Sequence, residues 1–374
     1  MPHAVRYAPA LLCLALAAAA CGGDDGGPEP DLTVEATGNH PVSTMRVVAT
    51  DPARGRELTM QVWYPGGASS SVPIDLLEED PARTQYADLL AAAPAQCPTL
   101  RSNADPTQPG ITEAGPFPLL LFSHCHECTR LSGLTIAERL ASHGFVVLAV
   151  DHAGNTLWNQ LAGDGLPLDT DTLELRVGDL EFAAAQIATN PAFSAVAAVI
   201  DPAPGKTGVF GHSFGSVTAG LYAQRHEVGA VFGLAAPMQN PLLAGVTITQ
   251  IAEPIGFLVA REDNSISELG NDLIRSNFDA ATSPTWKIEV ADAGHWSVSD
   301  LVGLVDGFAP GCGEGVRQTD GQPFTYLFPN TGRDIAASYV TAFFKTTLLA
   351  DAGAQAYLES AHPPATVTVD ARTP

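Results

Sequence analysis

The stretch that most limits how this chain can fold is residues 207–216, which read TGVFGHSFGS. An apolar run leads into G-H-S-F-G, and a helix-compatible segment rich in small residues follows over residues 216–224. A strand, a sharp turn and a helix in this order form the context that a G-x-S-x-G nucleophile motif requires. Gly211 and Gly215 fit the motif because the turn leaves no room for a Cβ atom beside the serine. The pattern predicts that Ser213 presents its hydroxyl at the top of a sheet, within reach of a base.

Apolar runs and helical patterns alternate around this stretch. The predicted strands are residues 117–123 and 145–150, the apolar run that leads into Gly211, and residues 229–234, 255–260 and 286–290. The predicted helices are residues 131–143, 173–189, 216–224 and 335–349. Residues 42–50 and 57–64 alternate apolar and polar side chains on either side of a turn-forming stretch, which predicts an antiparallel pair at one edge. The alternation indicates an α/β fold with a mostly parallel, doubly wound sheet, helices on both faces and an antiparallel N-terminal edge.

We expect one domain over residues 32–374, because the sequence has no internal repeat and no second core pattern. Within it, residues 68–115 are irregular and Pro-rich, with a possible helix over residues 86–93. A segment of this length is more typical of an insertion that packs on the body or shapes a rim than of a separate domain.

The amino-acid composition indicates a globular protein and limits the kinds of partner that it can bind. Hydrophobic residues make up 45% of the chain and charged residues 16%, which fits a globular protein with a sizeable core. The net charge of −23 argues against nucleic acids and anionic membrane surfaces as partners.

The N-terminus reads as an export signal. Arg6 supplies a thin positive region, and residues 8–20 form an apolar run that is too short to span a bilayer. A signal peptidase could cut after Ala20 and remove residues 1–20 as a signal peptide. The alternative, which we favour, resembles a bacterial lipoprotein signal, with a lipidated Cys21 and a flexible tether of Gly, Asp and Pro over residues 21–31. We therefore expect an exported protein, lipid-anchored in the bacterial cell envelope or else periplasmic or secreted, that meets a membrane only through this anchor.

Four cysteines lie beyond the leader and Cys21, and an even number in an exported chain suggests disulfides. They are Cys97, Cys125, Cys128 and Cys312. Three connectivities are possible, and our preferred pairs are Cys125 with Cys128 and Cys97 with Cys312. The stretch at residues 124–128 also holds residue types that bind metals, namely His124, Cys125, His126 and Cys128, so a metal site is an alternative. The spacing offers no distant second half, and an oxidising compartment favours a disulfide, so we expect no metal.

A serine hydroxyl is a weak nucleophile at neutral pH and needs a general base, which is usually a histidine oriented by a carboxylate. We choose His295 as the base, because it follows a predicted strand and Gly294 before it allows a tight turn. His226 lies too close to Ser213 along the chain, and His362 lies in a Pro-rich tail.

The acid should lie at the carboxyl end of a strand between the serine and the histidine, where ligand-facing groups gather in open α/β sheets. Asp263 meets this condition, in the turn R-E-D-N that follows residues 255–260. Glu262 is a close rival on the same turn, and Asp292 is a third candidate that would have to fold back toward the base. We choose Asp263.

The reaction also needs hydrogen-bond donors for the oxyanion that forms on the carbonyl. One should be the backbone N–H of Phe214, which follows the nucleophile. The other should come from the loop after residues 117–123, which reads S-H-C-H-E-C, and His126 is our choice.

With these residues in hand, the chain resembles the α/β-hydrolase superfamily that includes platelet-activating-factor acetylhydrolases, dienelactone-hydrolase-like proteins and bacterial cutinases and polyester hydrolases. The resemblance runs from about residue 47 to residue 344. It is densest in FPLLLFSHCHECTRLSGLTIAERLASHGFVVLAVDH, GVFGHSFGS and DAGHWSVSD. Such enzymes commonly read F-S-H-G where this chain has Cys125 in place of the glycine, so a Cys125–Cys128 bridge would stiffen this loop. The resemblance places the nucleophile at Ser213, the base at His295 and the oxyanion donors at His126 and Phe214.

The sequence therefore predicts a serine carboxylic-ester hydrolase that needs no cofactor and acts on lipid, small acyl or polyester-type esters. Two alternatives stay open. One is a lipoprotein that binds ligands on a hydrolase fold without turning them over, and the other is a lactone or peptide hydrolase that uses the same three residues.

Overall fold

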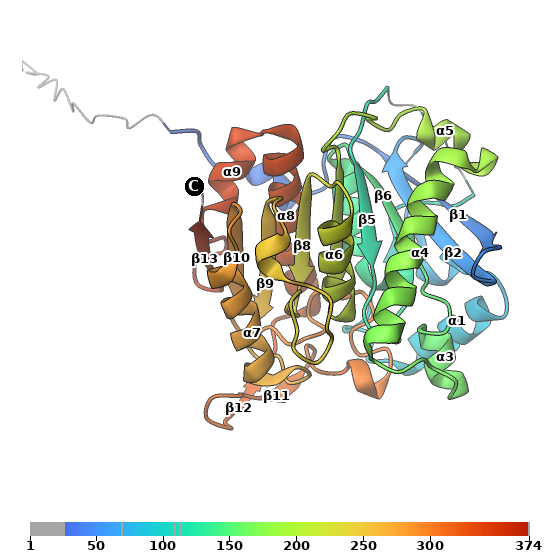
Figure 1. The fold of residues 1–374 in the computed structure, drawn as a ribbon. Coiled ribbons are helices and arrows are strands. Elements are labelled where there is room, and N and C mark those ends of the chain that lie inside the picture. Colours follow the sequence, from blue (N-terminus) through green and yellow to red (C-terminus); the bar gives the residue numbers. More distant parts are fainter. Residues whose placement is uncertain (1–26, 69, 108–109, 112–113, 373–374) are drawn as a thin grey trace, which may run out of the picture.

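A sheet of nine strands organises the part of the chain that the computed structural model describes, which is residues 27–68, 70–107, 110–111 and 114–372 (Figure 1). The predicted signal peptide and Cys21 lie outside these residues. The strands lie side by side in the order β1-β2-β6-β5-β7-β8-β9-β10-β13. Their bounds are β1 Val42–Asp51, β2 Arg56–Pro65, β5 Leu119–Ser123, β6 Val146–Val150, β7 Thr207–His212, β8 Ala230–Leu234, β9 Ile255–Ala260, β10 Thr285–Val290 and β13 Val367–Arg372.

Helices and short ribbons fill the connections. The helices are α1 Ala82–Ala92, α2 Leu134–Ser142, α3 Leu157–Ala162, α4 Thr170–Thr189, α5 Ser194–Ala197, α6 Phe214–Arg225, α7 Ser267–Ala280, α8 Pro329–Leu349 and α9 Ala352–Leu358. Short 3₁₀ turns occupy Leu32–Glu35, Ile74–Leu77, Arg130–Gly133, Pro191–Phe193, Ile248–Gln250 and Asp306–Phe308. Two small ribbons pair β3 Val72–Pro73 with β4 Arg101–Ser102 and β11 Glu314–Val316 with β12 Pro323–Thr325.

Strand directions confirm the predicted fold class. The six central strands, from β6 through β5, β7, β8 and β9 to β10, run parallel. At one edge β1 pairs antiparallel with β2, which in turn pairs antiparallel with β6. The opposite edge was not predicted, because β13 follows a Pro-rich stretch and pairs antiparallel with β10.

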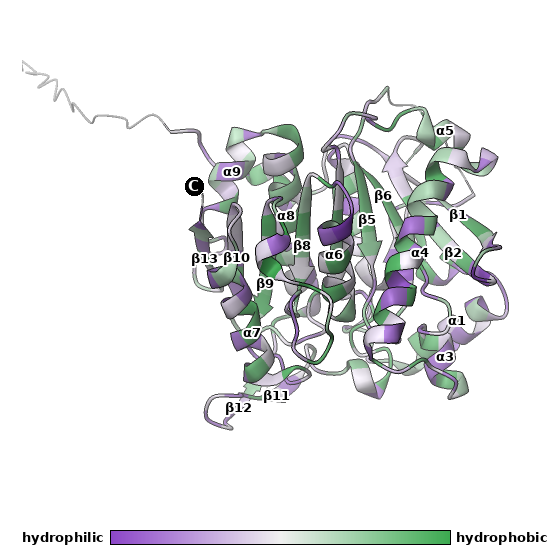
Figure 2. Cartoon of the chain, viewed as in Figure 1, coloured by the Kyte–Doolittle hydropathy of each residue, from purple (hydrophilic) through white to green (hydrophobic). Residues whose placement is uncertain are grey.

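Alternation along the buried strands divides the core into two layers. In β5, Leu119 and Leu121 face the layer that holds α4, α6 and α7, whereas Leu120 and Phe122 face the layer that holds α2 and α8. All residues of β5 are buried, as expected for a strand covered by helices on both faces. Figure 2 shows the apolar strands enclosed by helices whose outer faces are hydrophilic.

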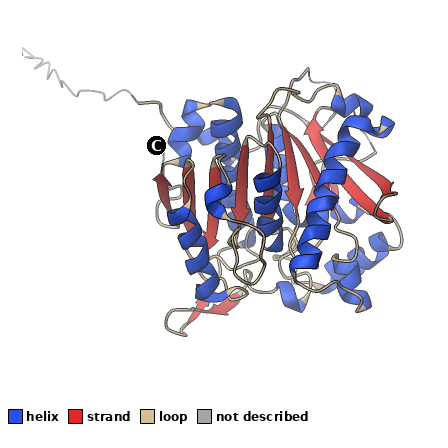
Figure 3. Ribbon diagram, viewed as in Figure 1, coloured by secondary structure: helices blue, strands red, loops and turns tan. Residues whose placement is uncertain are grey.

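The loops that leave the carboxyl ends of the parallel strands gather along one edge of the sheet, beside α3 and the β11–β12 ribbon (Figure 3). Ser213, Asp263 and His295 follow β7, β9 and β10 at this edge. The insertion at residues 68–115 contributes α1, β3 and β4, and a Cys97–Cys312 disulfide ties it to the loop after His295. Of the helices in the described residues, none combines the length and apolar character needed to cross a membrane.

Candidate active site

The turn at Ser213 is held in a strained conformation by close backbone packing. Ser213 has φ +57° and ψ −121°, in a region that residues with a side chain rarely adopt, and its N–H donates to the Leu234 carbonyl at 2.9 Å. A Cβ atom on Gly211 would lie 2.0 Å from the Gly215 carbonyl oxygen. A Cβ atom on Gly215 would lie 2.0 Å from the Ser123 carbonyl oxygen at the end of β5. Both glycines are therefore required by the packing of β5, β7 and α6 at this turn.

Three side chains from separate loops form one line of hydrogen bonds. His295 Nε2 lies 2.8 Å from Ser213 Oγ, and His295 Nδ1 lies 2.7 Å from Asp263 Oδ2. Because an ionised carboxylate only accepts hydrogen bonds, Nδ1 carries the imidazole proton and Nε2 accepts from the Ser213 hydroxyl. The side chains of His295 and Asp263 are 3% and 0% exposed. The structure thus brings together the residues that the sequence suggested as nucleophile, base and acid.

Local hydrogen bonds aim Asp263 at His295. Its Oδ1 accepts from the backbone N–H groups of Ser265 and Ile266, at 3.0 Å each, which leaves Oδ2 for the histidine. Glu262, the rival on the same turn, is turned away and pairs with Arg317 at 2.8 Å. Asp292, the third candidate, pairs with the same Arg317 at 2.8 Å.

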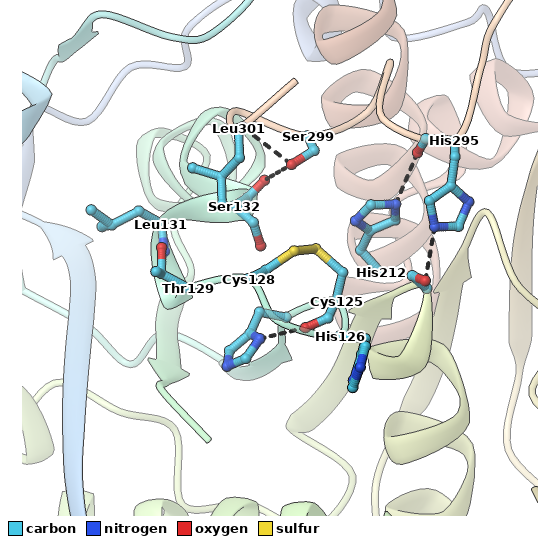
Figure 4. Close-up of a disulfide and its surroundings, with 12 residues drawn as sticks. Cys125, His126, Cys128, Thr129, Leu131, Ser132, His212, His295, Ser299 and Leu301 are labelled. Atoms are coloured by element: carbon cyan, nitrogen blue, oxygen red, sulfur yellow. Dashed lines mark hydrogen bonds between the residues drawn. A yellow bond between two sulfur atoms is a disulfide. The ribbon is translucent and has the colours of Figure 1, made fainter. Parts of the chain in front are cut away.

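His212 is a second histidine at the site, which the sequence did not single out. It is buried, and its Nε2 lies 2.9 Å from the His295 carbonyl oxygen, so this nitrogen carries the proton and donates. Burial is the main cause that holds the pKa of His212 well below its usual value, with the nearby His295 as a further cause, so the ring is neutral. His212 occupies the variable position of G-x-S-x-G and fixes the backbone that carries the predicted base (Figure 4).

The loop that carries His295 is braced by a later segment. The N–H of Trp296 donates to the Pro310 carbonyl at 3.0 Å, and the Ser297 hydroxyl donates to the Gly311 carbonyl at 3.2 Å. The next residue, Cys312, forms the disulfide to Cys97 in the insertion. Two tryptophan side chains near the site pack against other aromatic rings. Ring centroids are 4.1 Å apart for Trp296 and Phe308 and 6.2 Å apart for Trp158 and Tyr86.

The loop after β5 carries His126, which the sequence suggested as one of the two hydrogen-bond donors for the oxyanion. Cys125 and Cys128 form a buried disulfide within it (Figure 4). The ring centroids of His126 and Phe214 are 6.0 Å apart, so the two residues predicted as oxyanion donors are neighbours. His126 Nδ1 lies 2.8 Å from the Asn155 amide nitrogen, a contact that the sequence did not suggest.

The same disulfide bears on the metal alternative, because its two sulfurs are joined to each other and cannot serve as thiolate ligands. Across the described ranges, no three His, Cys, Asp or Glu side chains are grouped so that they could hold a metal ion.

Comparisons with known proteins agree with this architecture. The family model for platelet-activating factor acetylhydrolase, isoform II, matches residues 86–159, which include the Cys125–Cys128 loop. A ferulic acid esterase from Streptomyces cinnamoneus superposes with a TM-score of 0.66 over 92% of this chain and 99% of that chain, at 22% identity. This chain has an α/β-hydrolase-like fold. The resemblance that the sequence suggested is thus confirmed at this level, and no curated protein sequence matches the chain significantly.

In α/β-hydrolases the reacting groups follow one another along the chain as serine, acid and histidine. Ser213, Asp263 and His295 stand in that order here, each on a loop at the carboxyl edge of the sheet. The α/β-hydrolase fold therefore accounts for why residues 82 positions apart, Ser213 and His295, meet within hydrogen-bond distance.

Proposed function

We propose that this α/β-hydrolase is an exported serine hydrolase of carboxylic esters. The observation that carries the proposal is the unbroken line from Ser213 Oγ through His295 to Asp263, with contacts of 2.8 and 2.7 Å. The names of the matched family and structure, an acetylhydrolase and an esterase, support the same chemistry. Lipid esters, small acyl esters and polyesters all remain within this class.

In the first half of the reaction, Ser213 Oγ attacks the ester carbonyl while its proton passes to His295 Nε2. Asp263 stabilises the imidazolium that results and keeps the ring oriented. Negative charge develops on the carbonyl oxygen, where the backbone N–H groups of Phe214 and His126 stabilise it. Collapse of this intermediate expels the alcohol, which takes the proton from His295, and leaves the acyl group on Ser213.

In the second half, water takes the place of the alcohol. His295 accepts a proton from the water as it attacks the acyl carbonyl, and the same donors hold the second oxyanion. The carboxylic acid leaves and Ser213 regains its proton. Each step uses side chains of this protein and water, so the mechanism calls for no metal or organic cofactor.

The test is hydrolysis of short-chain nitrophenyl esters by the purified protein and its Ser213→Ala variant. The proposal predicts turnover by the wild type that the substitution abolishes. A wild type without activity across short esters, long esters and a polyester film would contradict it and would favour a protein that only binds such ligands.

We also propose that the protein is held at the cell envelope by a lipid on Cys21. The last residue of the proposed tether, Asp31, pairs with Lys345, and the nearby Leu348 carbonyl accepts from Lys206, just before β7. This end of α8 lies at the amino ends of the strands, opposite to Ser213. An anchor there would leave the active site facing away from the membrane.

Replacing Cys21 by Ala should move the protein from the membrane fraction to the soluble fraction, because it removes the acylated residue. Mass spectrometry of the mature wild-type N-terminus shows directly whether Cys21 carries a lipid. A wild-type N-terminus that carries an unmodified Cys21 would contradict the anchor and would leave cleavage by an ordinary signal peptidase.

A further inference from the structure

A buried cation without a carboxylate at ion-pair distance contacts the Phe214 ring and the loop that carries His126. Arg176, on α4, is 0% exposed, and all its hydrogen-bond acceptors are neutral. They are the Thr218 hydroxyl at 3.1 Å, the Asn155 side-chain oxygen at 2.5 Å, the Ser123 hydroxyl at 3.0 Å and the His124 carbonyl. Within the described part of the chain, no carboxylate lies within ion-pair distance of this guanidinium. Asp179, one turn further along α4, is taken by Arg54, Arg56 and His152.

Burying a guanidinium without a carboxylate is costly, because the loss of hydration is not offset by a paired charge. Burial lowers the pKa of Arg176 to about 9, and the more distant charge of Asp179 offsets only part of this effect. A folded core gains little from such a group, since an apolar residue of similar volume could fill the same space at lower cost. The contacts of Arg176 therefore indicate a role other than stability.

Those contacts reach both predicted oxyanion donors. The guanidinium carbon lies 4.6 Å from the centroid of the Phe214 ring, a cation–π contact with one donor residue. Because arginine only donates, Asn155 turns its oxygen toward Arg176 and its NH₂ group toward His126. The NH₂ group then donates to His126 Nδ1 at 2.8 Å and fixes the ring of the second donor residue. A further bond, to the His124 carbonyl, holds the loop two residues before His126.

We propose that Arg176 is the positioning residue of the oxyanion site. It holds the Phe214 and His126 segments in register, directly and through Asn155, and places a positive charge behind the two N–H groups. The inference rests on the proposed ester hydrolysis and adds a residue to it that touches neither the substrate nor the three residues of the Ser213 line.

Asn155→Ala is the cleanest test, because it cuts the link from Arg176 to His126 and leaves the cation in place. Asn159→Ala is the matched control: the same substitution four residues on, at an amide that bonds Thr156 and Asp164. Arg176→Lys and Arg176→Gln extend the series, the first keeping a charge without the planar fork of donors. Titration with an organophosphate counts the folded, reactive sites in each preparation.

The decisive readout compares an ester with the thionoester that has the same acyl and leaving groups. Sulfur accepts hydrogen bonds weakly, so turnover of the thionoester depends little on the oxyanion donors. We expect Asn155→Ala to lower kcat for the ester about tenfold or more with little change in KM, since a misplaced donor loses part of the 10² to 10³ that such a donor supplies. The ratio of ester to thionoester turnover should fall by the same factor, and further in Arg176→Gln.

An unchanged ratio in Asn155→Ala, with Asn159→Ala also unchanged, would overturn the role of Arg176 while leaving the proposed function intact. Loss of activity for both substrates equally would also overturn it, because that result would mean damage to the Ser213 line. Activity that does not depend on Ser213 would remove the proposed function, and this inference with it.

Discussion

At the scale of single residues, the site depends on which way each polar side chain is turned. Asp263 and Glu262 are neighbours at the end of one strand, and alternation along that strand could not separate them. Backbone N–H groups at residues 265 and 266 capture one oxygen of Asp263, whereas Arg317 captures Glu262. The choice between them is therefore made by local backbone N–H groups for Asp263 and by Arg317, which lies in a different part of the chain, for Glu262.

Asp263→Asn should lower kcat by about 10⁴, the loss typical of a triad aspartate replaced by asparagine, because the charge is removed and the amide NH₂ holds the histidine in the wrong tautomer. Glu262→Gln is the matched control and should change kcat less than about threefold, because Glu262 pairs with Arg317 and accepts from the Gln318 N–H, and neither contact involves His295. Steady-state kinetics on one nitrophenyl ester compares the two. The reverse order of effects would show that the acid has been misassigned.

Motif and chain order were enough to suggest Ser213, His295 and Asp263, since each stands at a loop position that chemistry restricts. Two other residues of the site could not be found in this way. His212 stands at a motif position that tolerates any side chain, and its role appears only once the His295 carbonyl lies 2.9 Å away. Arg176 lies on the core face of a predicted helix. The role of a polar residue at such a position cannot be predicted until its hydrogen-bond acceptors are known.

At the scale of elements, the site depends on how closely β5, β7 and α6 approach one another at the Ser213 turn. Gly215 lies in the first turn of α6 and packs directly against the end of β5. A side chain at this position would clash with the backbone of β5. The strained backbone at Ser213 persists because the close packing of β5, β7 and α6 around the turn holds it in place.

Gly215→Ala should therefore separate β5 from α6 and displace both Ser213 and the Phe214 N–H. We expect unfolding free energy to fall by about 1–3 kcal/mol, as in an overpacked core, and kcat to fall about 10² or more through misplacement. Gly307→Ala is the control, since its new Cβ would meet its nearest neighbour at 3.9 Å. Thermal unfolding and steady-state kinetics of both variants test this prediction. A Gly215→Ala protein with wild-type kcat would contradict the role of Gly215 in packing.

Long apolar strands were the easiest elements to predict, because a strand buried on both faces reads as a continuous apolar run. The elements missed have weaker patterns. Strand β13 lies at an edge, with only Val367 buried, and its pairing with β10 could not be read from a tail that follows prolines. Helix α7 is a different case: its apolar residues, such as buried Ile274 and Phe278, have helical spacing but are few among many polar residues, and no element was predicted for this segment.

At the scale of the whole molecule, the insertion at residues 68–115 is tied to the hydrolase body by polar contacts as well as a disulfide. Glu138 on α2 is buried and accepts from the Ser102 hydroxyl at 2.6 Å and from the backbone and side chain of Asn103 at 2.9 Å each. Burial outweighs these bonds and raises the pKa of Glu138 from 4.5 to about 7.

The raised pKa makes stability depend on pH. Between the unfolded value of 4.5 and the folded value of about 7 the folded protein binds the extra proton, so unfolding free energy falls as pH rises through this window. The loss attributable to Glu138 should be about 3 kcal/mol between pH 4.5 and 8. Denaturant unfolding of wild type and Glu138→Gln across this range isolates it, because the variant lacks the titrating group. Parallel pH profiles for the two proteins would contradict the assignment.

The central claim is that Ser213 becomes nucleophilic because His295 and Asp263 converge on it. Its most direct test is reaction with a nitrophenyl organophosphate, followed by peptide mass spectrometry. We expect release of one nitrophenolate per chain, a phosphoryl adduct on Ser213, loss of ester hydrolysis in step with the adduct, and no such reaction in His295→Ala. Full ester hydrolysis by a protein whose Ser213 carries the adduct, or an equally fast reaction in His295→Ala, would contradict it.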